Sequence, residues 1–173
     1  SKLISRVICS TDDIEIASVA REYGAEVPFL RPKSISDDHA LDLDFHVHAL
    51  DWLKINEKYV PELIVQLRPT NPFRAVKVID QAIKLLIQNP QADSLRAVRP
   101  CEHSPYKMWS KNSDGLIDPI LQLSNEKEPY NMPRQKLPKI YQQDGYIDIT
   151  RSRVVLEMNS TTGKNILPFL IDE

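Results

Sequence analysis

Residues 63–74, LIVQLRPTNPFR, carry the densest set of groups that could bind a ligand. A run of apolar residues, typical of a buried strand, changes there into a loop that holds two prolines and two arginines. Each proline fixes one φ angle, so the loop is stiff and its polar groups point in definite directions. Arg68, Thr70 and Asn71 can donate hydrogen bonds to a phosphate, a carboxylate or the edge of a base, whereas Arg74 is the better candidate for a structural role. The alternative is an ordinary strand-to-helix turn in which Thr70 or Asn71 caps the next helix.

The segments around this loop alternate between strand and helix patterns. Strands are predicted at residues 7–10, 26–30, 63–67 and 94–98, and helices at residues 12–23, 41–53 and 76–86. Asp12 and Glu15 have the spacing of a capping box at the start of the first helix. Ala17, Ala20 and Tyr23 share one face of that helix. The alternation predicts an α/β fold of three layers, α/β/α, which is Rossmann-like and has a mainly parallel central sheet.

The sequence pattern changes from Asp93 onward, although residues 94–98 still continue the sheet. Residues 106–123 have the pattern of two short strands around a turn at residues 112–115. Residues 124–139 are polar and contain three prolines, which makes them too irregular for a core element. This part of the chain is therefore expected to lie outside the central core.

Composition restricts the class of protein. The chain has 173 residues, 42% of them hydrophobic and 27% charged, enough for one compact domain. A net charge of -2 argues against a general partner for nucleic acid or membrane. Cys9 and Cys101 are the only two cysteines, which favours a reducing cytoplasm over a disulfide framework. No apolar run approaches the roughly 18 residues that span a bilayer. We therefore expect a soluble, cytoplasmic protein.

The order of several segments resembles one known family. The segments STDD, EYGAEVPFLRP, LRPTNPFR, EHSPYKMW and YQQDGYIDI are similar to those of the CMP-sialic acid synthetases, the acylneuraminate (nonulosonate) cytidylyltransferases, and follow the family order along nearly the whole chain. The resemblance implies a nucleotidyltransferase fold over residues 1–173. It also implies that CTP activates an acidic nine-carbon keto sugar, such as sialic acid, to give CMP-sugar and pyrophosphate. A homodimer is implied as well, with residues 106–140 as the dimerisation insertion.

On the nucleotide side, the resemblance places Arg31, Ala40 and Asp42 beside the cytosine base. A guanidinium at Arg31 can donate in plane to the base's carbonyl oxygen and ring nitrogen, unless it is simply a solvated arginine before a proline. Asp42 stands where the family has a serine. Because an ionised carboxylate only accepts hydrogen bonds, Asp42 either receives the cytosine amino group or caps the following helix.

On the sugar side, Arg68, Thr70 and Asn71 are the expected contacts in the proline loop. Many sialate-activating relatives carry glutamine where this chain has Arg68. The arginine adds a positive charge that can pair with a phosphate or with the carboxylate of the acid sugar. A structural salt bridge at the end of the strand is an equally good interpretation of Arg68.

Three further residues complete the predicted sugar site. Arg134 matches a family arginine that holds the substrate carboxylate, and Gln135 is expected to assist it. Asp148 replaces an aromatic ring of the family with a carboxylate, which suggests a polar contact with an amino or hydroxyl substituent and leaves the identity of the sugar open. A metal role for Asp148 alone is weak because Mg²⁺ needs several oxygen ligands.

The sequence lacks two parts that the resemblance leads us to expect. Its four glycines are too scattered to form a glycine-rich phosphate loop, and the family's acidic metal motif is absent. We therefore expect an N-terminal phosphate-loop unit and the ligands of Mg²⁺ to lie outside these residues, which would make the segment incomplete for catalysis. Two alternatives remain: an enzyme for another keto acid sugar, of the legionaminate, pseudaminate or eight-carbon Kdo type, or a non-catalytic dimeric binding module of the same fold.

Overall fold

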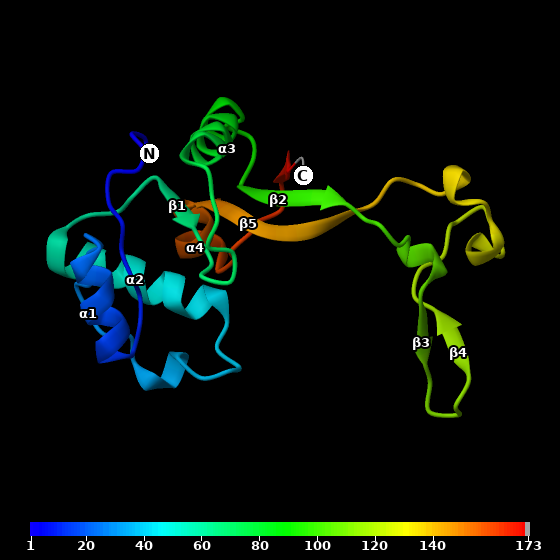
Figure 1. The fold of residues 1–173 in the computed structure, drawn as a ribbon, viewed down its shortest axis with the longest axis horizontal. Coiled ribbons are helices and arrows are strands. Elements are labelled where there is room, and N and C mark those ends of the chain that lie inside the picture. Colours follow the sequence, from blue (N-terminus) through cyan, green and yellow to red (C-terminus); the bar gives the residue numbers. More distant parts are fainter. Residues whose placement is uncertain (172–173) are drawn as a thin grey trace. The chain divides into compact units, whose positions relative to one another are not determined.

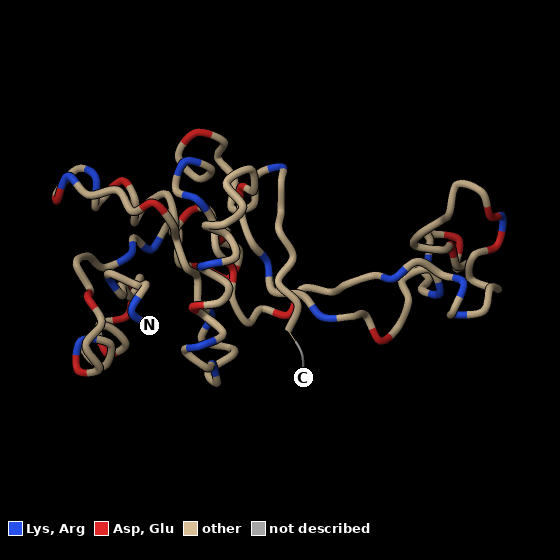
Figure 2. Tube along the Cα trace, turned by 90° about the horizontal axis from the view of Figure 1, so that it is seen from above, with Lys and Arg blue, Asp and Glu red and all other residues tan. Residues whose placement is uncertain are grey.

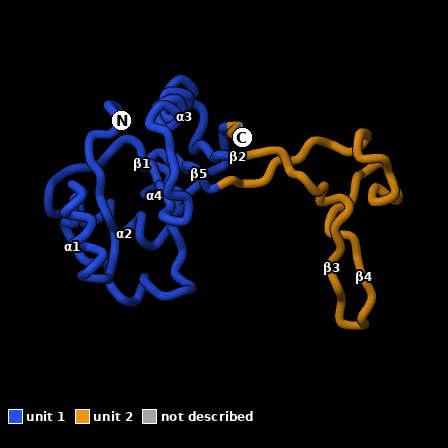
Figure 3. Tube along the Cα trace, viewed as in Figure 1, with its two compact units in different colours: residues 1–97, 145–169 blue, residues 98–144, 170–173 orange. Residues whose placement is uncertain are grey.

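The computed structural model describes residues 1–171, and these divide into two compact units (Figure 3). Residues 1–97 and 145–169 form the first unit, and residues 98–144 with 170–171 form the second. The predicted insertion, residues 106–140, lies within the second unit. Its proposed role in dimerisation stays a prediction.

A four-stranded sheet forms the centre of the fold. Its strands are β1 (Leu63–Gln66), β5 (Tyr141–Arg151), β2 (Ser94–Pro100) and β6 (Ile166–Leu170), and they pair in the order β1-β5-β2-β6. β1 and β5 are antiparallel, with Gln66 opposite Asp148. Side chains from the middle of the sheet, such as Leu95 and Ile149, are fully buried. The register brings the end of β1, and the loop that follows it, next to the middle of β5.

Helices lie on both sides of this sheet. They are α1 (Ile14–Glu22), α2 (Asp42–Glu57), α3 (Val76–Gln88) and α4 (Ser152–Met158). Figure 1 shows α3 on one side of the sheet and α2 with α4 on the other, where α2 and α4 pack together. The inward face of α3 buries Ile79, Ile83 and Leu86, as its helical spacing predicts. The predicted α/β class is confirmed, although the sequence did not indicate the antiparallel pairing of β1 with β5.

The first helix begins one residue later than its capping pattern predicts. Asp13, and not Asp12, is the N-cap: its carboxylate accepts hydrogen bonds from the amides of Glu15 and Ile16 at 2.7 and 2.9 Å. Asp12 instead lies 3.7 Å from the guanidinium of Arg31. Tyr23, predicted on the same face as Ala17, follows the last helical residue and is 85% exposed.

The two strands predicted before α2 are shorter in the structure than the sequence indicated. Residues 7–10 and 26–30 meet only at one parallel bridge, between Ile8 and Glu26. Pro28 has no amide hydrogen, so the ladder cannot continue along the second segment. The two segments are therefore paired through this one bridge.

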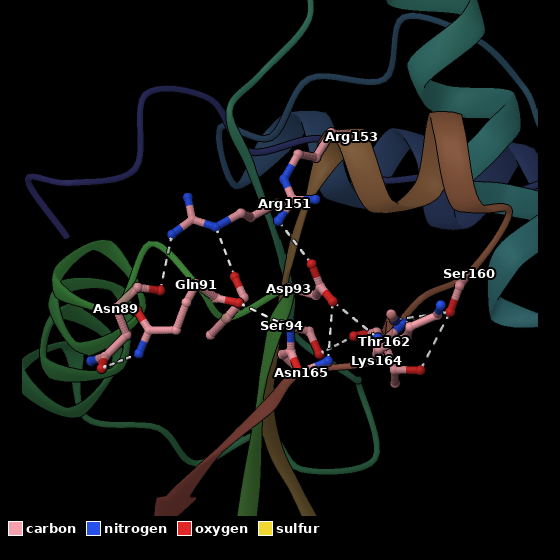
Figure 4. Close-up of polar contacts among 12 residues, drawn as sticks. Asn89, Gln91, Asp93, Ser94, Arg151, Arg153, Ser160, Thr162, Lys164 and Asn165 are labelled. Carbon is pink, nitrogen blue, oxygen red and sulfur yellow. Dashed lines mark hydrogen bonds and ion pairs between the residues drawn. The ribbon is translucent and has the colours of Figure 1, made fainter.

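A buried carboxylate closes the loop between α4 and β6 (Figure 4). Asp93 accepts hydrogen bonds from the backbone amides of Lys164 and Asn165, both at 3.0 Å, and from Arg153 at 2.8 Å. These amide donors hold the pKa of Asp93 below its usual value. Gly163 lies against this carboxylate with φ at +68°, and a Cβ at that position would lie 2.5 Å from the Cβ of Asp93. We call Asp93, Arg153, Gly163, Lys164 and Asn165 the Asp93 cluster.

The second unit is built from a hairpin and short turns. β3 (Trp109–Lys111) and β4 (Ile117–Pro119) pair antiparallel around the predicted turn. The remaining elements are the 3-10 turns η2 (Pro105–Lys107), η3 (Pro129–Asn131) and η4 (Arg134–Lys136). The ring of Trp109 packs on that of Tyr130 with centroids 4.6 Å apart. One further 3-10 turn, η1 (Lys33–Ile35), lies in the first unit before α2.

Charge is evenly distributed along the chain. Figure 2 shows basic and acidic residues interspersed along the described trace, in keeping with the net charge of -2. Within residues 1–171, no helix is both long enough and apolar enough to cross a membrane.

Candidate functional site

The loop after β1 is fastened to β5 by Arg74. Its Nε donates to the carbonyl oxygen of Tyr146 at 2.6 Å, and one terminal nitrogen donates to the carbonyl oxygen of Arg68 at 2.7 Å. The hydroxyl of Tyr146 in turn accepts from the amide of Ala75 at 2.7 Å. Arg74 thus has the structural role that the sequence favoured. The helix cap is Ala75, so the alternative in which Thr70 or Asn71 caps this helix is wrong.

Thr70 and Asn71 sit at the tip of this loop. Thr70 is exposed and Asn71 is half-buried, and the Asn71 amide donates to the carbonyl oxygen of Arg68 at 3.2 Å. This turn keeps the Asn71 backbone in place while the two side chains stay near the surface. Both remain predicted substrate contacts.

Four alternating charges meet where β1 ends. Arg68 forms a two-pronged ion pair with the carboxylate of Asp42 in the first turn of α2. The same guanidinium lies 3.5 Å from Asp148 of β5, and Asp148 is bound by Arg96 of β2 at 2.9 Å. We call these four residues the Asp42 network. It joins three positions that the sequence assigned separately: Asp42 to the base, and Arg68 and Asp148 to the sugar.

The side chains of the Asp42 network differ in solvent exposure, from buried Asp148 to partly exposed Asp42 and Arg68. The side chain of Asp148 is 5% exposed and that of Arg96 is 18% exposed, whereas Asp42 and Arg68 are each 32% exposed. A ligand can therefore reach Asp42 and Arg68 directly, but Asp148 only if the surrounding ion pairs rearrange. Two positive and two negative groups balance in charge, which is what permits this degree of burial. Leu41, and not Asp42, is the N-cap of α2, so the alternative capping role of Asp42 is wrong.

The protonation states in this region follow from burial and from Arg68. Burial by itself would raise the pKa of Asp42, but the hydrogen bond and charge of Arg68 outweigh it and hold that pKa below its usual value. His46, one turn further along α2, is buried, and desolvation lowers its pKa to about 4. The charges of Arg68 and Arg96 lower it further, while Asp42 opposes them. At neutral pH, Asp42 is therefore ionised and His46 uncharged.

Arg31 and Ala40 lie in the segment that leads into α2. The Nε of Arg31 donates to the hydroxyl of Ser36 at 3.0 Å, and its guanidinium lies over the ring of Phe45, 5.6 Å from the centroid. Phe45 follows Asp42 by three residues on α2, so both belong to the same helix face. Ala40 is half-buried just before the helix. The three residues assigned to the base thus gather around the start of α2.

Arg134 and Gln135 lie in the second unit, on η4, and both are exposed. Arg134 lines a cavity of about 370 Å³ in that unit, together with Ser104, Leu137 and Lys139. Two positive side chains and the acidic Glu102 share this lining with apolar residues. A carboxylate attached to an apolar group has the matching chemistry.

The described residues do not offer a site for Mg²⁺. Within residues 1–171, no three His, Cys, Asp or Glu side chains come together in a way that could hold a metal ion. The carboxylates of Asp42 and Asp148 are engaged by arginines instead. No step can therefore be assigned to a metal held by these residues.

Comparison with known proteins identifies the family. Residues 1–157 match the cytidylyltransferase family. The chain belongs to this family. A match over most of the chain agrees with the predicted nucleotidyltransferase, and cytidylyltransferases transfer a nucleotidyl group by definition.

Individual relatives and one solved structure are similar to this chain. The CMP-N,N'-diacetyllegionaminic acid synthase of Campylobacter jejuni is 31% identical over 173 residues, which is 100% of this chain and 71% of that protein. The pseudaminic acid cytidylyltransferase of the same species is 29% identical over 157 residues, 91% of this chain and 65% of that protein. The solved structure of CMP:2-keto-3-deoxy-manno-octonic acid synthetase aligns with a TM-score of 0.62 at 12% identity, covering 97% of this chain and 73% of that one. This structural likeness supports the fold.

Sequence reasoning missed Arg96. It stands between the fully buried Leu95 and Ala97 in β2. An arginine in such a strand is rarely buried unless it is paired, and this was a usable signal. Its partner, Asp148, could not be named without the order of the strands.

Proposed function

We propose that the complete protein is a cytidylyltransferase that activates an acidic nonulosonate sugar with CTP. The observation that carries this proposal is the family match over residues 1–157, together with the likeness to proteins named for legionaminic and pseudaminic acids. In the reaction, the anomeric hydroxyl oxygen of the keto acid sugar attacks the α-phosphorus of CTP. The bond from that phosphorus to the bridging oxygen breaks, pyrophosphate leaves, and the hydroxyl proton is released. Catalysis of this kind depends on positioning and charge stabilisation.

The proposed nucleotide side consists of Arg31, Ala40 and Asp42. Arg31 is held by Ser36 and by the ring of Phe45, which limits the freedom of its guanidinium. A pre-oriented guanidinium loses less entropy when it donates to a base. Asp42 supplies an ionised acceptor in the first turn of α2. Together they offer the donor and acceptor groups that a cytosine edge requires.

Residues predicted to contact the sugar occur in each unit, and each set is described by itself. Thr70 and Asn71 offer polar groups at the tip of the loop after β1, and Arg134 and Gln135 offer exposed donors on η4. Arg134 is the proposed ligand of the sugar carboxylate because its guanidinium lines a cavity that holds more positive than negative side chains and is part apolar. Arg68 and Asp148 are engaged in ion pairs, so any contact they make with the sugar competes with those pairs.

Three further features belong to this proposal. Mg²⁺ would neutralise the charge of the triphosphate, through ligands other than those described here. A cytoplasmic location fits two free cysteines. A homodimer would cover the apolar side chains of the second unit's hairpin, where Leu116 and Ile117 are 67% and 58% exposed. Light scattering at about 20 µM, above a micromolar dissociation constant, would contradict the dimer if it gave a monomer mass.

The function is tested by an assay of the full-length protein. Each of the four nucleoside triphosphates is combined with legionaminate, pseudaminate, N-acetylneuraminate or Kdo, and pyrophosphate release is measured with and without Mg²⁺. We expect release with CTP and one nine-carbon acid sugar. Preference for Kdo would change the sugar class and keep the reaction. Absence of release with every pair would contradict the proposal and favour a binding module.

A further inference from the structure

The Asp42 network links a surface carboxylate to two side chains deep in the sheet. Its members come from four elements or their ends: Asp42 from α2, Arg68 after β1, Asp148 from β5 and Arg96 from β2. Only the Asp42 end combines a partly exposed carboxylate with a position beside the residues proposed for the base. The other end is closed, because Asp148 lies between two arginines.

We propose that Asp42 selects cytosine over uracil by accepting the base's exocyclic amino group, and that Arg68, Asp148 and Arg96 are positioning residues that hold its carboxylate in place. This inference rests on the proposed function. It gives Arg96 a role that the sequence did not suggest, and it gives Asp148 a role that requires no contact with the sugar.

The chemistry of selection follows from what a carboxylate can do. Cytosine carries an amino group, a donor, where uracil carries a carbonyl oxygen, an acceptor. An ionised Asp42 accepts hydrogen bonds and cannot donate, so a uracil oxygen in the same place would face another acceptor without a proton between them. The pair with Arg68 keeps Asp42 ionised and still leaves each carboxylate oxygen with a further lone pair. With 32% of its side chain exposed, Asp42 is accessible to a ligand.

The positioning role follows from competition for one guanidinium. Arg68 lies within 3.5 Å of Asp148 while it binds Asp42 through both terminal nitrogens. Arg96 satisfies Asp148 from the other side at 2.9 Å. Without Arg96, the buried Asp148 would lose one of its two arginines and depend more on Arg68, because an uncompensated buried charge is costly. Arg68 would then be drawn away from Asp42, and the Asp42 carboxylate would lose its fixed orientation.

The test compares kcat/KM for CTP with kcat/KM for UTP in the full-length protein. Asp42→Asn keeps the side-chain shape but can present a donor to uracil, so the CTP-to-UTP ratio should fall about 10- to 100-fold, the range for a hydrogen bond to a charged group. Arg96→Met should lower the ratio about 3- to 10-fold through Asp42, and Arg96→Lys should restore part of it. Arg99→Met is the matched control: Arg99 lies on the same strand, three residues on, and pairs with Asp144 at 3.7 Å. Its ratio should not change.

Each outcome decides a separate question. If the unmodified protein turns over no CTP with any acid sugar, the proposed function itself fails. If it prefers CTP and Asp42→Asn keeps that preference, the proposed function stands and this inference is overturned. If Asp42→Asn does not fold, Asp42→Ala removes the carboxylate without restoring the serine of the family and is judged by the same ratio. An Arg96→Met variant that loses CTP and UTP activity equally would overturn the positioning role.

Discussion

Two buried aspartates in this protein are satisfied in different ways. The carboxylate of Asp93 accepts hydrogen bonds from two backbone amides and one arginine. These bonds fix the loop before β6. The carboxylate of Asp148 lies beside two arginines, Arg96 and Arg68. Arg68 also pairs with Asp42, whose side chain is 32% exposed. A carboxylate bound mainly by backbone amides fixes the chain segments that it joins, here Asp93 and residues 164–165. A carboxylate that is linked through an arginine to a second, partly exposed carboxylate can transmit its constraint to a ligand. We therefore expect changes at the Asp93 cluster to affect stability, and changes at the Asp42 network to affect nucleotide choice.

The largest effect on stability is expected from Gly163→Ala. The new methyl group would lie 2.5 Å from the Cβ of Asp93, and the residue would be held at φ +68°. Overpacking and the left-handed backbone together should lower the free energy of unfolding by about 2 to 4 kcal/mol. Urea denaturation measures this. Gly24→Ala is the matched control, because Gly24 has φ +85° but no atom within 4 Å, and it should lose only about 1 kcal/mol.

A comparable effect is expected from pH through His46. Its pKa falls from 6.5 to about 4 on folding, so the unfolded chain takes up a proton first as the pH drops. This contribution to stability is complete above pH 6.5 and is lost as the pH falls to about 4, by about 3 kcal/mol in total. The free energy of unfolding, measured from pH 7 to 4, should flatten over this window in His46→Leu. An identical slope in both proteins would contradict the burial of an uncharged histidine beside the Asp42 network.

The smallest effect on stability is expected from Arg68→Gln. Arg68 and Asp42 are each 32% exposed, so solvent screens their ion pair, and unfolding should become easier by only about 1 kcal/mol. The CTP-to-UTP ratio should nevertheless fall about tenfold, because Asp42 loses its two-pronged partner. A loss of stability without any change in the ratio would place the Asp42 network in the same class as the Asp93 cluster.

Local patterns in the sequence predicted some elements well, whereas β5, α4 and β6 were not predicted. Apolar runs and helical spacing located β1 and α3 to within two residues. Both patterns depend only on residues that are close together in the sequence. The hairpin of β3 and β4 followed from its turn in the same way. Corrections came where one residue competed with its neighbour, as Asp13 did with Asp12 for the N-cap of α1.

The sequence could not predict how the candidate residues pair. Asp42 and Arg68 are 26 residues apart, and Arg96 and Asp148 are 52 apart. Such pairs depend on which strands are neighbours and in what register, and neither property leaves a local pattern. The sequence predicted Asp42, Arg68 and Asp148 as binding residues one by one. Only the fold indicates that their side chains act on one another.

The most direct test measures stability and nucleotide choice in the same pair of full-length variants, Asp42→Asn and Gly163→Ala. Each is compared with the unmodified protein by urea denaturation and by the ratio of kcat/KM for CTP to that for UTP, with the acid sugar that the unmodified protein prefers. Asp42→Asn should lower the ratio at least tenfold and change stability by no more than about 1 kcal/mol. Gly163→Ala should do the reverse, with a large loss of stability and an unchanged ratio. If both variants shift both quantities together, the distinction between a network that selects the nucleotide and a cluster that holds the fold is contradicted.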